Sequence, residues 1–170
     1  MSQHMPDHFD PWRFADRAKR LNGSYSLADL PRLSGCLADP QGDAHFDVQF
    51  YRDKRHRACA QGKVEASLLL RCQRCLGTLQ FEVKADVSIG FVEGLDEAEQ
   101  LPEDLDPQMV KEGRVALRDL IEDELLLALP QVAMHPIGEC MVPTGEPGDK
   151  PVAKKQSPFA VLAQLKRHGE

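Results

Sequence analysis

Apolar and polar residues alternate in three successive stretches in the middle of the chain. Every second position is mostly apolar in residues 44–53, 62–72 and 79–92. A period of two is typical of strands that bury one face and leave the other in water. Short connections between such strands favour antiparallel pairing. The pattern predicts an α+β protein with a small antiparallel sheet of three to five strands, between about residues 44 and 110.

A different period follows in residues 117–129, where apolar residues recur at helical spacing. The stripe consists of Leu117, Leu120, Ile121, Leu125 and Ala128, and Pro130 comes directly after the segment. Proline cannot continue a helix because it lacks the amide hydrogen and clashes with the preceding turn. This segment is therefore predicted to be the main helix, with its apolar stripe packed on the sheet.

The two ends of the chain carry weaker helical signals. Asp10 and Pro11 are a suitable N-cap and first residue for a short helix to about Lys19, and Ser26 opens a second short helical piece. Ser157 and Pro158 begin a short amphipathic C-terminal helix in the same way. The predicted parts are an N-terminal arm (1–40), one α+β domain (41–130), a Pro/Gly-rich irregular segment (131–156) and the C-terminal helix (157–170).

Charge is distributed unevenly around a net value of −6. Residues 81–150 hold 17 Asp and Glu against 5 Lys and Arg, and "GLDEAEQLPEDLDP" within them is predicted to be an acidic loop. Residues 1–80 and 151–170 are each slightly basic. The overall charge argues against a general nucleic-acid binder, while the asymmetry allows one face to meet RNA or an acidic face to dock a basic protein.

The termini and the cysteines indicate a compartment. The first residues lack the charged and apolar regions of a secretory signal, and no apolar run is long enough to span a membrane. Five cysteines with uneven spacing do not form a disulfide framework. We therefore expect a cytoplasmic protein.

The stretch "RCQRCLG" holds a Cys-x-x-Cys pair at the predicted turn between the second and third strands. Cys72 and Cys75 have a downstream counterpart in His135 and Cys140, so the four residues form a C-x2-C…H-x4-C pattern. Three thiolates and one imidazole are a ligand set that zinc accepts in structural sites. The 59 residues between Cys75 and His135 make this signal moderate rather than strong.

Two other interpretations of these cysteines stay open. Cys72 and Cys75 could be half-buried thiols at a hairpin, with His135 and Cys140 in an unattached tail, and the sequence does not decide between this and one structural zinc. A thioredoxin-type redox pair is less favoured, because that motif lies at the start of a helix in a βαβ unit. Cys36 and Cys59 have no paired spacing and are interpreted as small hydrophobic residues.

Basic residues gather in "YRDKRHRACAQGK", which is predicted to hold a hairpin turn. We expect RNA phosphate contacts from the cations of this stretch and of the Cys-x-x-Cys motif: Arg52, Lys54, Arg55, Arg57, Arg71 and Arg74. Together they could form one basic patch, although the residues by themselves slightly favour a solvated hairpin tip.

The run Glu122-Asp123-Glu124 invites an acid–base proposal, but successive helical residues point about 100° apart. Glu124 is the member predicted to lie on the apolar stripe, where a structural hydrogen bond or ion pair is favoured over catalysis. The sequence shows neither a nucleophile pattern nor a phosphate-binding glycine loop.

Four blocks of this sequence resemble one known family. They are "DPWRFADRAKRLNGSY", "LLLRCQRCLGTLQFEV", "LIEDELLLALPQVAMHPIGEC" and "SPFAVLAQLKR". In order and spacing they resemble the YceD family, the large ribosomal RNA subunit accumulation proteins of bacteria and plastids, and the proteobacterial branch in particular. Other branches carry a more cysteine-rich segment where this sequence has His135 and Cys140.

The resemblance implies a role in the synthesis, processing or stability of 23S ribosomal RNA. It supplies no catalytic residues, so we expect a non-enzymatic ribosome biogenesis factor that binds precursor 23S rRNA or an assembling large subunit. The alternative is a protein-interaction adaptor, which would act through the acidic surface and "PFAVLAQL" on a basic ribosomal or RNA-processing protein without touching RNA.

Overall fold

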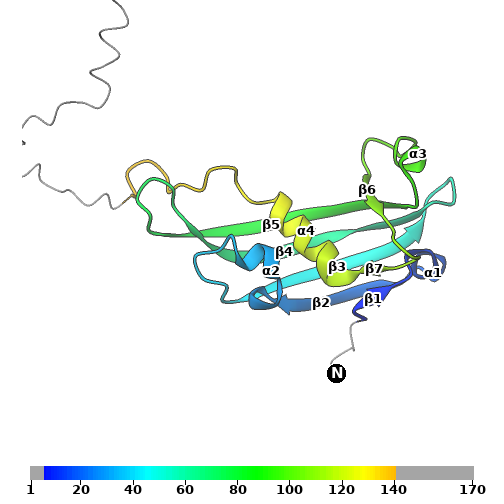
Figure 1. The fold of residues 1–170 in the computed structure, drawn as a ribbon, viewed down its shortest axis with the longest axis horizontal. Coiled ribbons are helices and arrows are strands. Elements are labelled where there is room, and N and C mark those ends of the chain that lie inside the picture. Colours follow the sequence, from blue (N-terminus) through cyan, green and yellow to red (C-terminus); the bar gives the residue numbers. More distant parts are fainter. Residues whose placement is uncertain (1–5, 141–170) are drawn as a thin grey trace, which may run out of the picture.

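The computed structural model describes residues 6–140 and shows an α+β fold built on one long sheet (Figure 1). Five strands lie in the order β2-β3-β4-β5-β6. Their bounds are Arg20–Ser26 (β2), Asp43–Arg52 (β3), Ala58–Arg71 (β4), Thr78–Val92 (β5) and Asp106–Met109 (β6). The pairs from β2 to β5 are antiparallel, and β6 pairs with β5 in parallel. The predicted fold class is confirmed.

A smaller two-stranded ladder and several short helices complete the described part. Strands His8–Phe9 (β1) and Val115–Ala116 (β7) pair with each other and join the N-terminal segment to the start of the main helix. The helices are Pro11–Asp16 (α1), the 3-10 turn Leu27–Asp29 (η1), Pro31–Ser34 (α2), Leu95–Ala98 (α3) and Leu117–Leu127 (α4).

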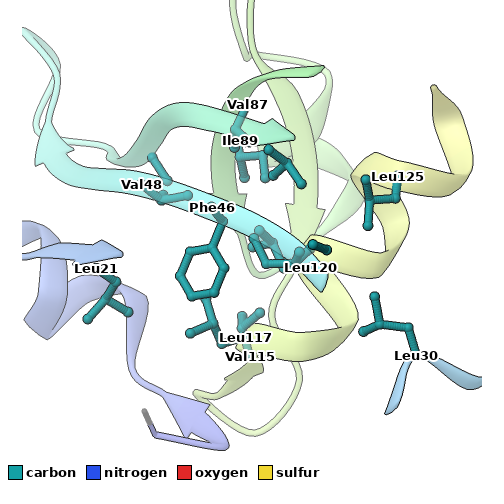
Figure 2. Packing of buried hydrophobic residues seen from close by; sticks show 14 of the residues in the cluster. Leu21, Leu30, Phe46, Val48, Val87, Ile89, Val115, Leu117, Leu120 and Leu125 are labelled. Carbon is teal, nitrogen blue, oxygen red and sulfur yellow. The ribbon is translucent and has the colours of Figure 1, made fainter. Parts of the chain in front are cut away.

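The alternating apolar and polar residues of the strands lie on opposite faces of the sheet, with the apolar residues on the buried face. In β3, Ala44, Phe46, Val48 and Phe50 are buried, while the residues between them are more exposed. Figure 2 shows Leu117, Leu120 and Leu125 of α4 within the core that this inner face forms. Helix α4 is amphipathic and buries its apolar stripe here, which stabilises both elements by removing apolar surface from water. The predicted packing of this helix on the sheet is confirmed.

Strands β3 and β4 approach each other closely near the middle of the sheet. Gly62 pairs with Val48, and a Cβ atom at this position would collide with the carbonyl oxygen of Asp47. Only glycine fits such a close backbone approach without a shift of one strand. The long strand β4 therefore depends on this residue for its place beside β3.

The exposed face of the sheet has mixed charge. Lys63 lies between Asp47 and Asp86 on the neighbouring strands, and Glu65 lies between His45 and Lys84. Opposite charges that alternate across strands stabilise the sheet and cancel each other's field. This face therefore offers no continuous basic surface to a nucleic acid.

Some predicted boundaries differ from the structure. Residues 20–26 lie in the predicted N-terminal arm but form β2, the edge strand of the main sheet. The predicted acidic loop contains α3 and the first two residues of β6 and so is ordered in part. The first helix begins at Pro11 as predicted, with Asp10 accepting a hydrogen bond from the Arg13 amide, but ends at Asp16. The predicted C-terminal helix and residues 141–156 of the irregular segment lie outside the described residues.

Candidate functional site

The two halves of the cysteine–histidine pattern meet at one end of the sheet. Cys72 and Cys75 lie in the turn between β4 and β5, and His135 and Cys140 lie in the segment that runs back from α4 along the sheet (Figure 1). Their four ligand atoms all lie within 4.8 Å of one another. This brings together the four residues predicted as metal ligands, and it answers the open question about His135 and Cys140, which are not an unattached tail.

Each half of the cluster is shaped by its own tight turn. The Cys72 amide donates to the Gly77 carbonyl over 2.9 Å, and the Leu76 amide donates to the Cys72 carbonyl over 2.9 Å. Leu76 has a φ of 61°, a left-handed conformation that is unusual for a leucine. In the second half Gly138 has a φ of 94°. The two halves are joined by a hydrogen bond from the Gln73 amide to the Ala133 carbonyl.

Three of the six distances between the ligand atoms are close to those of a tetrahedral zinc site. Zn–S bonds of about 2.3 Å and Zn–N bonds of about 2.0–2.1 Å would place two sulfurs about 3.8 Å apart, and a sulfur and a nitrogen about 3.5 Å apart. The Sγ atoms of Cys72 and Cys140 are 3.6 Å apart. His135 Nδ1 is 3.4 Å from Cys75 Sγ and 3.7 Å from Cys140 Sγ.

The histidine is oriented for ligation by a second contact. His135 Nε2 lies 3.0 Å from the Thr78 carbonyl oxygen, an acceptor only, so this nitrogen carries the proton. The opposite nitrogen, Nδ1, then faces the three thiols with its lone pair. A backbone carbonyl that fixes the tautomer in this way is a regular partner of metal-binding histidines.

Backbone amides and neighbouring thiols shift the pKa values within the cluster. The Cys75 amide lowers the pKa of Cys72 to about 5, against the effect of burial and with help from the amides of His135 and Arg74. The Gly77 amide has the same effect on Cys75, but burial and the thiols of Cys72 and Cys140 outweigh it and raise the pKa of Cys75. The thiols of Cys140 and Cys72 raise the pKa of His135. Thiolates are the metal-binding form, so the low pKa of Cys72 favours ligation.

Arg74 holds the cluster together. Its Nε donates to Cys140 Sγ over 2.9 Å, and its Nη2 donates to the carbonyl oxygens of His135 at 3.0 Å and Pro136 at 3.2 Å. Zinc with three thiolates and one neutral imidazole would carry a net charge of −1, which this guanidinium offsets. Arg74, predicted as an RNA contact, therefore has a structural role that the sequence did not reveal.

The hairpin between β3 and β4 holds the other predicted cations. Arg52 donates to Asp16 Oδ1 over 2.8 Å and to the His56 carbonyl over 2.9 Å. Arg57 donates to Asp53 Oδ2 over 2.7 Å and to the Gln100 carbonyl over 3.0 Å. Both guanidinium groups are thus fixed by the fold and sit at the base of the turn.

Lys54 and Arg55 are the exposed cations at the tip of this hairpin. Within residues 6–140 neither takes part in an ion pair. Asp53 organises the turn beneath them, since its Oδ1 accepts the amides of Arg55 at 2.8 Å and Arg57 at 2.9 Å. These two side chains are available to an external anion.

The predicted cations do not form one patch. The hairpin cations precede β4, whereas Arg71 is the last residue of that 14-residue strand and Arg74 follows it. At about 3.3 Å per residue, the two groups are separated by up to about 43 Å. RNA contact by either group stays a prediction, but the single basic patch is excluded by the topology.

The carboxylate run on α4 has a structural role, carried by a residue other than the one predicted. Glu122 is only 1% exposed. Its Oε1 accepts the amides of Arg32 at 2.7 Å and Leu33 at 3.0 Å, and its Oε2 accepts Arg32 Nε at 2.8 Å. These bonds outweigh the effect of burial and lower the pKa of Glu122. Glu124, predicted to lie on the buried stripe, is half-buried, and burial next to Asp106 and Asp123 raises its pKa.

Comparison with known proteins identifies the family. Residues 60–166 match the family model described as "Large ribosomal RNA subunit accumulation protein YceD". A protein of Haemophilus influenzae with the same name is 36% identical over 168 residues, which cover 96% of this chain and 97% of that protein. No solved structure matches the chain. In residues 6–140 no helix is long and apolar enough to cross a bilayer. This chain belongs to the YceD family of large ribosomal RNA subunit accumulation proteins.

Proposed function

We propose that this protein is a cytoplasmic, non-enzymatic factor for large-subunit biogenesis that binds 23S rRNA, its precursor or an assembling particle. The observation that carries this proposal is the match over nearly the whole chain to a relative named for accumulation of the large ribosomal RNA subunit. The exposed cations Lys54 and Arg55 supply a point of contact with RNA phosphate. Arg52, Arg57 and Arg71 are further candidates at the two ends of β4.

Binding of transcribed 23S rRNA fragments at several salt concentrations tests this function. A Lys54→Glu, Arg55→Glu variant is expected to bind at least tenfold more weakly and with a shallower salt dependence, because it loses phosphate contacts. Lys84→Glu on the mixed-charge sheet face is a control away from the hairpin, with half of that charge change, and should leave binding nearly unchanged. Equal affinity and equal salt dependence for wild type and the hairpin variant would contradict RNA contact at this hairpin.

A second candidate is favoured by the separation of the cations. Since they do not converge, the protein could act as an adaptor that binds a basic ribosomal or RNA-processing protein through its acidic surface. Purification of the complex from cells, before and after ribonuclease treatment, separates the two. Basic proteins that remain bound after ribonuclease treatment, without rRNA in the untreated sample, would favour the adaptor.

We also propose that the Cys72, Cys75, His135 and Cys140 cluster holds one structural zinc. The fit of the ligand distances, the oriented histidine and the compensating Arg74 support this proposal. Metal analysis of protein purified without chelator should give about one equivalent of zinc. Cys36 is an exposed cysteine outside the cluster, so Cys36→Ser should keep the metal that Cys72→Ser loses. Less than about a tenth of an equivalent, with reduced thiols, would remove the zinc proposal.

A further inference from the structure

A hollow of about 400 Å³ lies beside the β3–β4 hairpin, at the opposite end of the sheet from the cysteine cluster. Helix α1, the hairpin and the segment after α3 form its walls, and these elements lie at the same end in Figure 1. Ala58, Phe91 and Val92 form a buried apolar floor. The volume is within the range of about 300–1,000 Å³ that is usual for sites of small organic groups.

The rim of the hollow combines an aromatic ring with cations. Trp12, the single tryptophan of the chain, is partly exposed and lines one side. Arg52, Arg55 and Arg57 line the hairpin side, and Gln100 contributes from the loop. An aromatic face next to guanidinium groups is how proteins hold an unpaired nucleobase and its phosphate, because every base has a stacking face and every nucleotide a negative charge.

The walls are held in place before any ligand binds. Asp10 caps α1 through the Arg13 amide and thereby fixes the helix that carries Trp12. The contacts of Arg52 with Asp16 and of Arg57 with Gln100 tie the hairpin to α1 and to the loop after α3. The side chains of Arg52 and Arg57, which are fixed in this way, lose little entropy when a ligand binds.

A second hollow of about 440 Å³ continues from the first. The two share four lining residues, which are Arg55, Arg57, Gln100 and Leu101, and the second adds Lys54. A chain that places a base in the first hollow can therefore pass its backbone over Arg55 toward Lys54. The lining of the two hollows includes four Lys and Arg side chains and two carboxylates. Arg57 is paired with Asp53 and Arg52 with Asp16, so Lys54 and Arg55 are the cations of the lining that have no ion-pair partner among the described residues.

We propose that the hollow lined by Trp12 and Arg55 binds one unpaired base of a single-stranded RNA segment. The base stacks on Trp12, and the adjoining phosphate contacts Arg55 and Lys54. This site rests on the proposed RNA-binding function and deepens it. Glu97, the second carboxylate of the lining, and the acidic segment around it repel a longer run of phosphates, so the contact is confined to one or two nucleotides.

The intrinsic fluorescence of Trp12 tests the inference directly in the full chain. Titration with a single-stranded 12-nucleotide oligoadenylate or oligouridylate should quench a large part of the emission, whereas a 12-base-pair RNA duplex should not. Two phosphate contacts predict a shallow salt dependence, with log K falling against log salt at a slope of roughly −1.4. Quenching by oligolysine instead of RNA would overturn the inference in favour of a basic protein ligand.

Substitution of Trp12 and of Arg55 distinguishes the contribution of base stacking to RNA binding from the contribution of charge. Trp12→Leu keeps apolar bulk without an aromatic face and should weaken binding of a labelled oligonucleotide about five- to a hundredfold, as expected for one stacked base. Trp12→Phe should retain most of the affinity, and thermal unfolding of both variants checks the fold. Arg55→Glu should weaken binding, whereas Lys84→Glu, the same charge change on the mixed-charge face of the sheet, should not.

The outcomes distinguish the inference from the function on which it rests. If Arg55→Glu weakens RNA binding but Trp12→Leu does not, and no quenching occurs, the base-binding site is wrong and the RNA-binding function stands. Equal binding of duplex and single strand also overturns the site. If the wild type binds neither these oligonucleotides nor 23S fragments, both proposals fail.

Discussion

The two ends of strand β4 carry arginines that the sequence alone does not distinguish, yet the fold uses them differently. At the end near the cysteine cluster, Arg74 donates to Cys140 Sγ and to two backbone carbonyls, and so closes the cluster. At the hairpin end, Arg55 is exposed and has no ion-pair partner in the described part of the chain. A cation inside a network serves the fold, whereas a cation without partners is available for a ligand.

The largest effect that separates the two ends is expected from Cys75→Ser. Loss of a thiolate should reduce zinc content by at least tenfold, because a structural zinc needs all four ligands. Amide hydrogen exchange should then speed up strongly in residues 131–140 and remain unchanged in the hairpin. Protection of residues 131–140 that survives the substitution would show that they are held to the sheet without metal.

A substitution on α4, between the two ends of the sheet, should lower the stability of the whole fold without a specific effect on the cysteine cluster or the hairpin. Glu122→Gln removes a buried charge that accepts three hydrogen bonds from α2, and should lower the free energy of unfolding by about 2–3 kcal/mol. Urea denaturation measures this loss, while zinc content and RNA affinity should stay close to wild type. Asp119→Asn, on the same helix, is a matched control.

The effect of Glu122 should depend on pH in a defined direction. The pKa of Glu122 is lower in the folded protein than its usual value near 4.5. Its contribution is therefore complete above that value and is lost as the pH falls through the lower, folded-state pKa. The difference in stability between wild type and Glu122→Gln should shrink in acid. A difference that grows in acid would contradict the assignment of Glu122 as a charged acceptor.

Arginine-to-lysine exchange gives a direct comparison of the two ends. Arg74→Lys keeps the charge but cannot reach three acceptors in one plane, so zinc affinity in a chelator competition should fall about 10- to 100-fold. Arg55→Lys should leave zinc affinity unchanged and retain most of the RNA binding. If both substitutions lower the zinc affinity equally, Arg74 and Arg55 do not differ in role.

The smallest predicted effect is a stabilisation at Leu76. This leucine has a φ of 61° and is 70% exposed, so it pays for a left-handed backbone without burying its side chain. Leu76→Asn should raise the free energy of unfolding by about 0.5–1 kcal/mol, since asparagine tolerates this conformation better. Gln73→Asn, in the same turn, should have no comparable effect. A loss of stability would show that the exposed leucine makes contacts in the intact protein.

Much of the sheet could be predicted because its central strands bury alternate residues. Strands β3, β4 and β5 follow the period of two, and α4 follows its apolar stripe. Strand β2 was missed because Asn22 and Gly23 resemble a turn and only Leu21 is a buried large hydrophobic residue there. Strand β6 has no buried residue, so its pairing leaves no pattern in the sequence.

The candidate site was predictable in its residue types but not in its contacts. Ligand spacing identified the cysteine–histidine set, although only the return of the chain after α4 closes the 59-residue gap. The sequence points to Glu124 rather than Glu122 as the buried carboxylate, because the apolar stripe of α4 identifies only the helix face that packs on the sheet. Glu122 faces α2, whose unsatisfied amides it caps, and the sequence gives no sign of that neighbour.

The length of β4 sets a spacing between whatever the two ends contact. Its 14 residues place the cysteine cluster and the hairpin up to about 43 Å apart. A single side chain or a single nucleotide cannot bridge that distance, so a ligand that occupied both ends would have to present two separate contact points. Linked contacts of this kind raise the effective concentration of the second site once the first is bound. The strand would then act as a spacer, and its length would set the separation of the two contact points that one ligand could occupy.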